Sequence, residues 1–324
     1  MTKMKTRNEI EKDFTDTFNQ LAYVHSGWQA WSDFVHCAAY AISNAVDPVH
    51  REAREKDYMR IVSKYKEAEG QAFARLLSAT VMALEENPDQ DFLGHIYMNL
   101  EMGNKHLGQC FTPFHLCKMM AKVTAPDVKS EIEGKGGWIS VADFCIGGGA
   151  MLIGFVSECR DQKVDFQSHC LFVGQDIDHT VAMMAYIQLS LLGCPGYIVV
   201  GNALTEPLTN PPLFAPMERE TFVTPMYCSD VWEARRAWSL VGRLFHAATS
   251  EEKPDSAPAT APEATAEPVP ALTEPSGVPE QVSFALPISE PIPAKEPVFK
   301  PTIAVRRAKK GFAEDQISMF DMIG

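Results

Sequence analysis

The most constraining feature of the chain is a segment in which an expected strand, a glycine turn and an expected helix follow one another. Residues 138–141 are mostly apolar and lead into Asp143, and the glycines 147–149 come next. The apolar residues 151–156 then predict a helix. α/β folds bring a nucleotide against backbone amides with this order of elements, because glycines allow close approach and a helix N-terminus offers free N–H donors. An ordinary tight connection between a strand and a helix is the alternative interpretation.

Three further segments flank this turn in a fixed order. Upstream lies Gly108-Gln109-Cys110-Phe111-Thr112-Pro113. Downstream, the apolar residues 170–173 lead into Gly174-Gln175-Asp176-Ile177-Asp178, and residues 197–200 lead into Gly201-Asn202-Ala203-Leu204. An acid at the tip of a second strand is suited to accept both hydroxyls of a ribose.

Expected strands and helices alternate over residues 105–247. We expect strands near 138–143, 170–175 and 196–201, and helices near 113–123, 149–161, 178–192 and 229–246. This alternation predicts an α/β fold in which helices cover a parallel sheet. Residues 9–67 and 69–84 are expected to be helical, and the aromatic and aliphatic residues of 14–42 recur at spacings of three, four or seven. Within this region, the pair Asp47-Pro48 is expected to begin a helix.

Composition narrows the class of protein. The chain has 324 residues, of which 46% are hydrophobic and 22% charged, and it contains no apolar run long enough to span a membrane. The basic N-terminus is not followed by an apolar segment, so we expect no secretory signal. The eight cysteines form no Cys-x-x-Cys pair. We therefore expect a cytoplasmic protein without disulfides and without a metal.

The net charge restricts how the chain can contact DNA. Its formal value is −13, and residues 251–300 contribute nine acids and three bases to it. A protein that binds DNA independently of sequence is expected to be basic. Three alternatives stay open: a local DNA contact, a partner that supplies the contacts with phosphate, or a substrate other than DNA.

The last quarter of the chain differs in composition from the rest. Eleven of the 22 prolines lie within residues 251–300. This predicts a disordered Pro/Ala/Glu-rich linker over 249–304. Residues 305–324 carry a basic patch and then Gln316-Ile317-Ser318-Met319-Phe320. This pentapeptide resembles the Q-L-[SD]-L-F peptide that binds the bacterial sliding clamp, and a chance match is the alternative.

Taken together, the four ordered segments resemble the N-6 adenine DNA methylase family, in particular the modification subunits of type I restriction systems. That family has G-Q-x-F-T-P, D-x-x-x-G-x-G, G-x-[DE]-I-[DN] and G-[DN]-x-L segments in this order, and the resemblance covers about residues 107–204. It implies a Rossmann-like class I methyltransferase core at 105–248 and an N-terminal helical domain at 1–104. It also implies S-adenosylmethionine as cofactor, DNA as substrate and a specificity subunit as partner.

The resemblance assigns five residues to the methionine half of the cofactor. Phe111 is expected to pack against it and Thr112 to form a hydrogen bond with it. Asp143 is expected to engage its amino group, directly or through water, while Gly147 and Gly149 let the backbone close over it. Strand-end capping and turn formation are the alternative role of Asp143.

For the adenosine half, the resemblance assigns Asp176 to the ribose hydroxyls, Ile177 to the face of the adenine ring and Asn202 to its edge. The family more often carries Asp at the position of Asn202. Turn formation is the alternative role of Asp176 and Asn202.

The resemblance also implies that Asn210, Pro211 and Pro212 form the catalytic loop. Adenine methylases carry [ND]-P-P-[YFW], in which the Asn side chain and a proline carbonyl accept hydrogen bonds from the exocyclic amine. The aromatic residue stacks on a base flipped out of the duplex. Here Leu213 follows the prolines, and Phe214 is the stacking residue one place late. A plain turn is the alternative interpretation.

The spacing before this loop departs from the family. Only a few residues separate Asn202 from Asn210, and Pro207 is among them. Proline is disfavoured in a central strand, so we expect no fourth strand before Asn210 and a shortened core.

Two hypotheses of different classes follow. The first is a DNA adenine N6-methyltransferase. The second is a catalytically inactive, methylase-like protein that binds S-adenosylmethionine and serves as an adaptor tethered to the sliding clamp or another DNA-processing partner. Methylation of RNA or protein stays open, because Asn-Pro-Pro chemistry also suits a glutamine side-chain amide.

Overall fold

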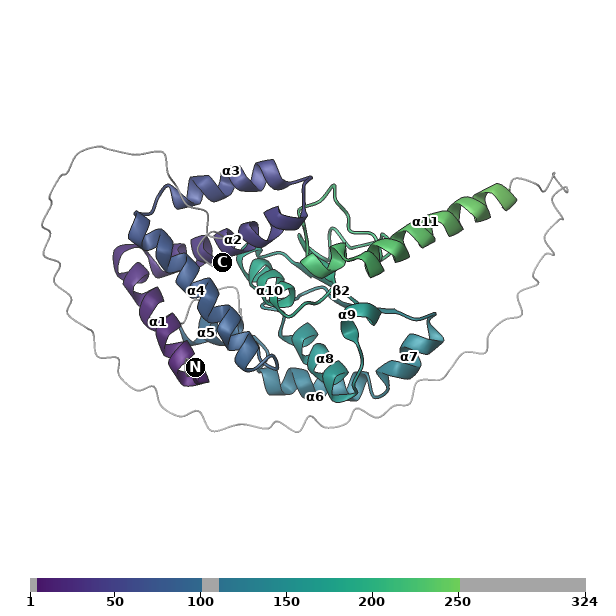
Figure 1. Ribbon diagram of the computed structural model, residues 1–324, viewed down its shortest axis with the longest axis horizontal. Helices are drawn as coiled ribbons and strands as arrows, with labels where there is room; N and C mark the ends of the chain where they lie inside the picture. Colours follow the sequence, from purple (N-terminus) through teal and green to yellow (C-terminus); the bar gives the residue numbers. More distant parts are fainter. Residues whose placement is uncertain (1–4, 101–110, 251–324) are drawn as a thin grey trace, which may run out of the picture. The chain divides into compact units, whose positions relative to one another are not determined.

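The computed structural model describes residues 5–100 and 111–250, with side chains as far as Leu244 (Figure 1). The predicted linker at 249–304, beyond its first two residues, lies outside this part of the chain. So do the basic patch, the peptide Gln316 to Phe320 and the first three residues of the segment that begins at Gly108.

Residues 5–100 fold into helices that share one apolar core. The pairs α1 with α4, α1 with α2 and α2 with α3 pack against each other (Figure 1). Phe14, Trp31 and Phe34 are fully buried, and the rings of Phe14 and Phe34 meet edge to face at 5.8 Å. The predicted aromatic stripe is therefore the core of this region. The helices are α1 (Arg7–Val24), α2 (Gly27–Val46), α3 (Arg51–Val62), α4 (Glu67–Glu86) and α5 (Phe92–Asn99).

A four-stranded sheet lies at the centre of residues 111–250, in the order β1-β2-β3-β4. The first three strands are parallel and β4 runs antiparallel to β3. Asp143 at the end of β1 pairs with Gly174, and Asp176 at the end of β2 pairs with Val200, so both acids lie at the carboxyl edge of the sheet. The strands are β1 (Ile139–Asp143), β2 (Cys170–Asp176), β3 (Gly196–Val200) and β4 (Thr221–Val223).

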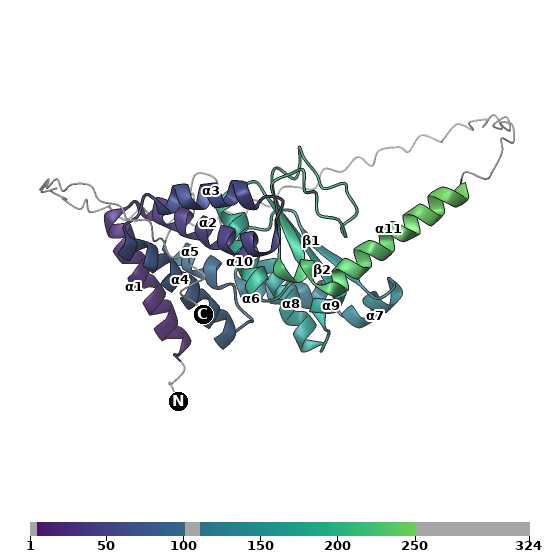
Figure 2. The ribbon, with the colours of Figure 1, turned by 45° about the horizontal axis from the view of Figure 1, so that its top comes forward.

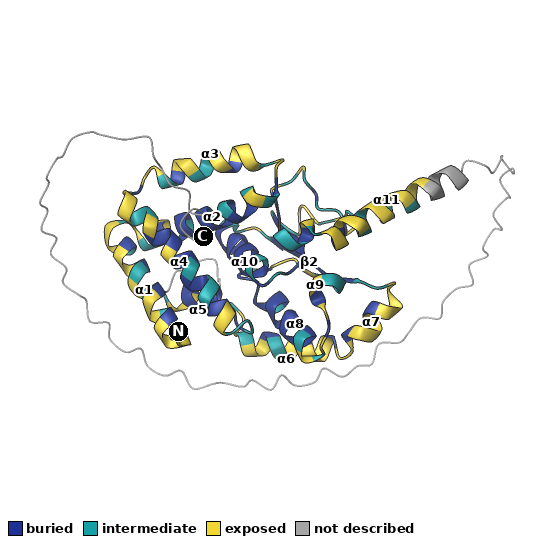
Figure 3. Cartoon of the chain, in the orientation of Figure 1, coloured by how far each residue is buried: buried dark blue, intermediate teal, exposed yellow. Residues whose placement is uncertain are grey.

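Helices cover the sheet unequally, and the fold is mixed α/β. On one face, Phe172 and Ile198 join the same apolar cluster as the N-terminal helices, with α10 packed against both α2 and the strands. Buried positions cover α10 almost throughout (Figure 3). On the other face, Leu213 and Trp232 cover β2 and β3. The remaining helices are α6 (Phe114–Thr124), α7 (Val128–Gly134), α8 (Ala150–Asp161), α9 (Phe166–His169), α10 (His179–Leu191), η2 (Pro225–Cys228) and α11 (Asp230–Ser250).

The last helix departs from the sheet along its length. The start of α11 is anchored by Trp232, which donates a hydrogen bond from Nε1 to the carbonyl of Gln167 (2.8 Å). Its C-terminal half extends beyond the other elements (Figure 2). Trp238 near the middle of α11 and Leu244 further along it are exposed. Within residues 5–100 and 111–250, no helix combines the length and the apolar character needed to cross a membrane.

The three predicted parallel strands and the helices between them are confirmed. Residues 201–220 contain no strand, as expected from Pro207. The short strand β4 was not predicted, because three residues are too few to show an alternating pattern. α5 and α7 were not predicted either, and each begins at an aspartate that accepts a backbone hydrogen bond, Asp91 from Gly94 and Asp127 from Ser130.

The helix expected at Asp47-Pro48 was placed wrongly. α3 begins at Arg51, with His50 as N-cap. The carboxylate of Asp47 instead accepts hydrogen bonds from the backbone N–H groups of Val49 (3.0 Å) and His50 (3.2 Å). Asp47 therefore closes the turn between α2 and α3 and does not cap the first turn of α3.

A buried arginine fastens these helices to the sheet. Arg54 is 6% exposed and donates hydrogen bonds to the Ser43 hydroxyl, to the Asp47 carboxylate (2.6 Å) and to the Thr221 carbonyl (2.6 Å). Its guanidinium lies 4.0 Å from the centre of the Phe222 ring. These contacts tie α2 and α3 to β4.

We expect Arg54→Met to lower the free energy of unfolding by about 3 kcal/mol, because it leaves the buried Asp47 carboxylate without its charge partner. Urea unfolding measures this loss. Arg60→Met is the matched control, since Arg60 pairs with Asp57 at the surface and its loss should cost only ~0.5 kcal/mol. Equal stability of the two variants would show that the Arg54 anchor contributes nothing.

Candidate functional site

The glycine turn, the end of β2 and Phe111 meet at the carboxyl edge of the sheet. The N–H of Gly147 donates a hydrogen bond to the carboxylate of Asp176 (2.8 Å). A Cβ atom at Gly147 would lie 3.4 Å from the Phe111 ring, and one at Gly148 would lie 3.5 Å from it. Three segments that are separated in the sequence are therefore in direct contact.

The backbone of the turn requires glycine at two positions. Gly147 has φ +52° and Gly149 has φ +94°, in the left-handed region that other residues adopt at a cost. Gly149 is also the N-cap of α8, and a Cβ there would lie 3.3 Å from Ala185 of α10. The turn thus lets Phe111 and Ala185 approach the backbone where a side chain would otherwise stand.

Two acids share this edge. The carboxylate of Asp143 accepts a hydrogen bond from the N–H of Cys145 (3.0 Å). Burial raises the pKa of Asp143, and the nearby charge of Asp176 raises it further. Asp176 accepts from Gly147 through one oxygen and from the N–H of Asp178 (2.9 Å) through the other. Carboxylate oxygens accept more than one hydrogen bond, so both acids shape the turns and still offer acceptors to a ligand.

The other predicted cofactor residues lie on the loops at this edge. Thr112 is exposed, and its carbonyl accepts from the thiol of Cys117 (3.7 Å). Ile177 is 69% exposed beside Asp176, which is unusual for a large apolar side chain. The side-chain oxygen of Asn202 accepts from the N–H of Leu204 (2.9 Å), so it already closes its own turn.

The predicted catalytic loop packs over the middle of the sheet. The amide of Asn210 donates to the carbonyl of Phe214 and also contacts the hydroxyl of Tyr197 on β3. Tyr197 pairs with Val173 in the middle of β2. Among the described residues, no hydrogen bond joins Asn210 to the glycine turn or to Asp176.

The residues after Asn210 are used for packing. Pro211 and Pro212 are exposed, whereas Leu213 is 5% exposed and lies in the apolar cluster beneath the loop. The ring of Phe214 is covered by the guanidinium of Arg243, at 4.9 Å from the ring centre. The structure therefore brings Phe111, the glycine turn and Asp176 of the predicted cofactor site together but does not join the Asn210 loop to them.

Sequence reasoning missed three residues behind the glycine turn. Asp91 and Gln188 are buried and connected to the carbonyl of Gly148, and the ring of Tyr97 stacks on Phe111. Two signals were available. Asp91 directly precedes an apolar run, as an N-cap does, and Gln188 interrupts an otherwise apolar helix.

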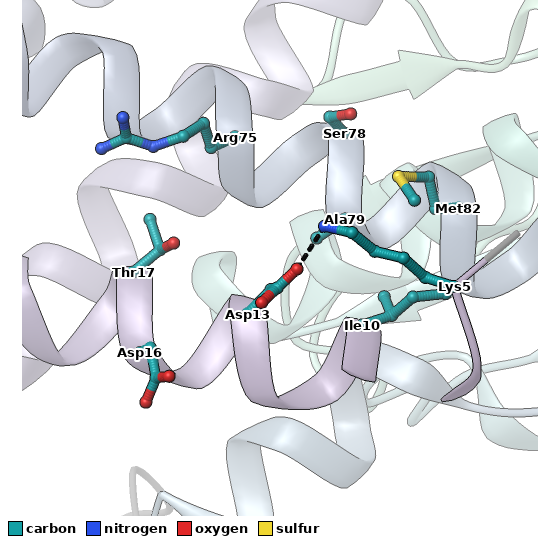
Figure 4. A pocket seen from close by; sticks show the side chains of 9 residues that line it. All are labelled: Lys5, Ile10, Asp13, Asp16, Thr17, Arg75, Ser78, Ala79 and Met82. Carbon is teal, nitrogen blue, oxygen red and sulfur yellow. Dashed lines mark hydrogen bonds and ion pairs between the residues drawn. The ribbon is translucent and has the colours of Figure 1, made fainter. Parts of the chain in front are cut away.

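A cavity of about 300 Å³ lies elsewhere, between α1 and α4 (Figure 4). Lys5, which contacts Asp13, lines it together with Asp16 and Arg75. None of the sequence-predicted site residues belongs to it, so it does not mark the cofactor site. In the part of the chain that the structure describes, no cluster of three or more His, Cys, Asp or Glu side chains is arranged to hold a metal ion.

Comparison with known proteins identifies a family. The model of the family described as N-6 DNA Methylase matches residues 88–253. No curated protein matches the chain. Among solved structures, the chain is similar to the methyltransferase subunit of a type I restriction-modification system from Streptococcus thermophilus, with 17% identity and a TM-score of 0.33. The match covers 64% of this chain and 42% of that subunit, so the chain spans less than half of its length.

We expect Gly149→Ala to lower the free energy of unfolding by about 2 kcal/mol, because alanine is strained at this φ and its methyl group crowds Ala185. Thermal or urea unfolding measures the change. Gly70→Ala is the control, since a Cβ in that turn of α4 meets nothing within 4 Å. That substitution should stabilise the helix by up to ~1 kcal/mol. A Gly149→Ala variant as stable as the wild type would contradict the strain argument.

Proposed function

Because the chain belongs to the N-6 DNA methylase family, we propose that it transfers a methyl group from S-adenosylmethionine to the exocyclic amine of adenine in DNA. Residues 105–248 are then a Rossmann-like class I methyltransferase core. The observation that supports this most directly is the contact of the glycine turn with Asp176 and Phe111 at the carboxyl ends of parallel strands. Open α/β sheets bind their ligands at this edge.

The residues at this edge fit the chemical groups of S-adenosylmethionine. Burial and, to a smaller extent, the charge of Asp176 raise the pKa of Asp143, and a bound ammonium group would offset both effects. The second acceptor position on each oxygen of Asp176 suits the two ribose hydroxyls. Exposed Ile177 offers an apolar surface to the adenine ring, and the ring of Phe111 walls the methionine half, with Thr112 beside it.

Asn210, Pro211 and Pro212 are the proposed catalytic loop, with Phe214 as the stacking residue. When bound, S-adenosylmethionine supplies an electrophilic methyl group. Asn210 and a proline carbonyl would accept hydrogen bonds from the target amine, which raises the electron density on its nitrogen. The Asn210 amide donates to the carbonyl of Phe214 through Nδ2 in this structure, whereas the target amine would donate to its Oδ1.

The proposed DNA contact needs help from outside the chain. With a formal net charge of −13, the chain offers little attraction to phosphate. We infer that a partner, such as a specificity subunit, supplies the basic surface that holds the duplex.

In the proposed cofactor site, Asn202 contributes the amide group of its side chain.

A second candidate function is binding of S-adenosylmethionine without methyl transfer, as an adaptor for a DNA-processing partner. The packing of the Asn210 loop favours it. Leucine stands where the family motif has an aromatic residue, and Leu213 is buried against the sheet instead of free to stack on a base. The tail peptide Gln316–Phe320 stays a prediction of how such an adaptor would reach the sliding clamp.

Calorimetric titration with S-adenosylmethionine tests the cofactor site. We expect saturable binding by the wild type and an affinity lower by about tenfold or more for Asp176→Ala, because the ribose hydroxyls lose their acceptors. Asp127→Ala is the control, since it also removes a carboxylate that accepts a backbone hydrogen bond, but in α7. If Asp176→Ala binds as tightly as Asp127→Ala, Asp176 does not belong to the site.

Transfer of a labelled methyl group to DNA of mixed sequence separates the two candidate functions. We expect the wild type to label adenine and Asn210→Ala to lose activity by at least about 100-fold, a loss typical of a group that acts in the transition state. Cofactor affinity should stay unchanged in this variant. A wild type that binds S-adenosylmethionine but labels no DNA would favour the adaptor, and labelling of RNA or protein would redirect the substrate class.

A further inference from the structure

A buried polar network lies directly behind the glycine turn. Asp91, the N-cap of α5, accepts hydrogen bonds at Oδ1 from the N–H of Gly94 (2.9 Å) and from Nε2 of Gln188 (2.7 Å). Gln188 lies on α10 and is 0% exposed. An N-cap residue that served only to begin a helix could lie at the surface, where water would share its hydrogen bonds. The burial of both side chains points to a role between elements.

Gln188 connects this cap to the turn. Its Nε2 also donates to the carbonyl of Gly148 (2.9 Å), and its Oε1 accepts from the N–H of Leu93 (3.0 Å). Both amide hydrogens and the amide oxygen are thus engaged, with α5 on one side and the turn on the other. The orientation of the amide is fixed, because a flipped amide would direct its NH₂ group at the Leu93 N–H and its oxygen at two acceptors.

Helix α5 also supports Phe111, through the ring of Tyr97. The ring of Tyr97 is fully buried and stacks on Phe111, with ring centres 5.3 Å apart and planes inclined by 18°. Phe111 in turn packs against the glycine turn, since a Cβ atom added at Gly147 would lie 3.4 Å from its ring. α5 is therefore linked to the turn through Gln188 of α10, and it contacts Phe111 through Tyr97.

We propose that Asp91, Gln188 and Tyr97 are positioning residues of the proposed cofactor site, and that α5 holds the glycine turn and Phe111 in the arrangement to which S-adenosylmethionine binds. The inference rests on the proposed cofactor. None of the three residues needs to touch the ligand. Their effect is to hold the carbonyl of Gly148 toward α10 and to hold Phe111 against the turn.

The burial of Asp91 makes asparagine the conservative substitution at this position. Burial raises the pKa of Asp91, against the opposing effect of its hydrogen bonds from Gln188 and Gly94. An asparagine at this position keeps an oxygen that accepts both bonds and carries no charge. Asp91→Asn should therefore preserve the brace, whereas Asp91→Leu should lose it.

Gln188→Met, compared with Gln90→Met, tests the brace. Gln90 is also buried and donates one hydrogen bond to a carbonyl, that of Ala83 (2.7 Å), so Gln90→Met removes a buried hydrogen bond that has no route to the turn. Hydrogen exchange of residues 144–151 is followed in the free protein, and S-adenosylmethionine is titrated calorimetrically into the same samples. Urea unfolding gives the global stability of each variant.

We expect Gln188→Met to raise exchange in the turn about tenfold and to weaken cofactor binding about tenfold. Gln90→Met should change neither beyond what its global stability explains, and Asp91→Asn should match the wild type in both. If Gln188→Met fails to fold, Asp91→Leu takes its place in both measurements, because it keeps Gln188 but removes the carboxylate that holds the Gln188 amide.

The two failures are distinguishable. Equal exchange of residues 144–151 in the Gln188 and Gln90 variants overturns the brace, whatever the cofactor does. A wild type that does not bind S-adenosylmethionine overturns the proposed function, while faster exchange confined to the Gln188 variant still supports the brace. Exchange that rises in the Gln188 variant without weaker binding shows that the turn is braced but that its position does not limit affinity, which overturns the proposed positioning role.

Discussion

The hydrogen bond from the Gly147 N–H to the Asp176 carboxylate is the constraint on which the rest of this edge depends. It joins the loop after β1 to the end of β2, so the turn cannot move independently of the sheet. The positive φ angles on both sides of Gly148 then send its carbonyl backward, where only a buried donor can satisfy it. Gln188 is that donor, and its own partners extend the dependence to α5.

Elements whose signal lies within their own residues could be predicted from the sequence. β1, β2 and β3 are apolar runs bounded by glycines and acids, and the helices between them, α8 and α10, are mostly apolar runs too long for a strand. β4 has no such signal, because its existence depends on distant residues. Phe222 is held between the Arg54 guanidinium and the Tyr40 ring, which stacks on it at 6.3 Å. Tertiary contacts of this kind override local propensity in short strands.

The two halves of the proposed site differ in the same way. The order of the motifs predicted that Phe111, Gly147 and Asp176 would meet, because the ends of adjacent parallel strands share one edge. The place of Asn210 could not be read from its motif. It depends on Leu213, whose apolar side chain is more stable in the cluster with Tyr197 and Tyr227 than in water. A leucine at this position converts a stacking residue into a core residue, and the loop follows it onto the sheet.

The N-terminal helices are linked to both the glycine turn and the Asn210 loop. α5 contacts the glycine turn through Gln188. α2 and α3 hold the end of the Asn210 loop, where Arg54 bonds the Thr221 carbonyl and the Nε2 of His50 lies 3.1 Å from the carbonyl of Met217. The sheet itself positions only the glycine turn, since residues 201–220, which include Asn210, form no strand. The N-terminal helices therefore fix the glycine turn and the Asn210 loop in place through contacts that the sheet alone does not supply.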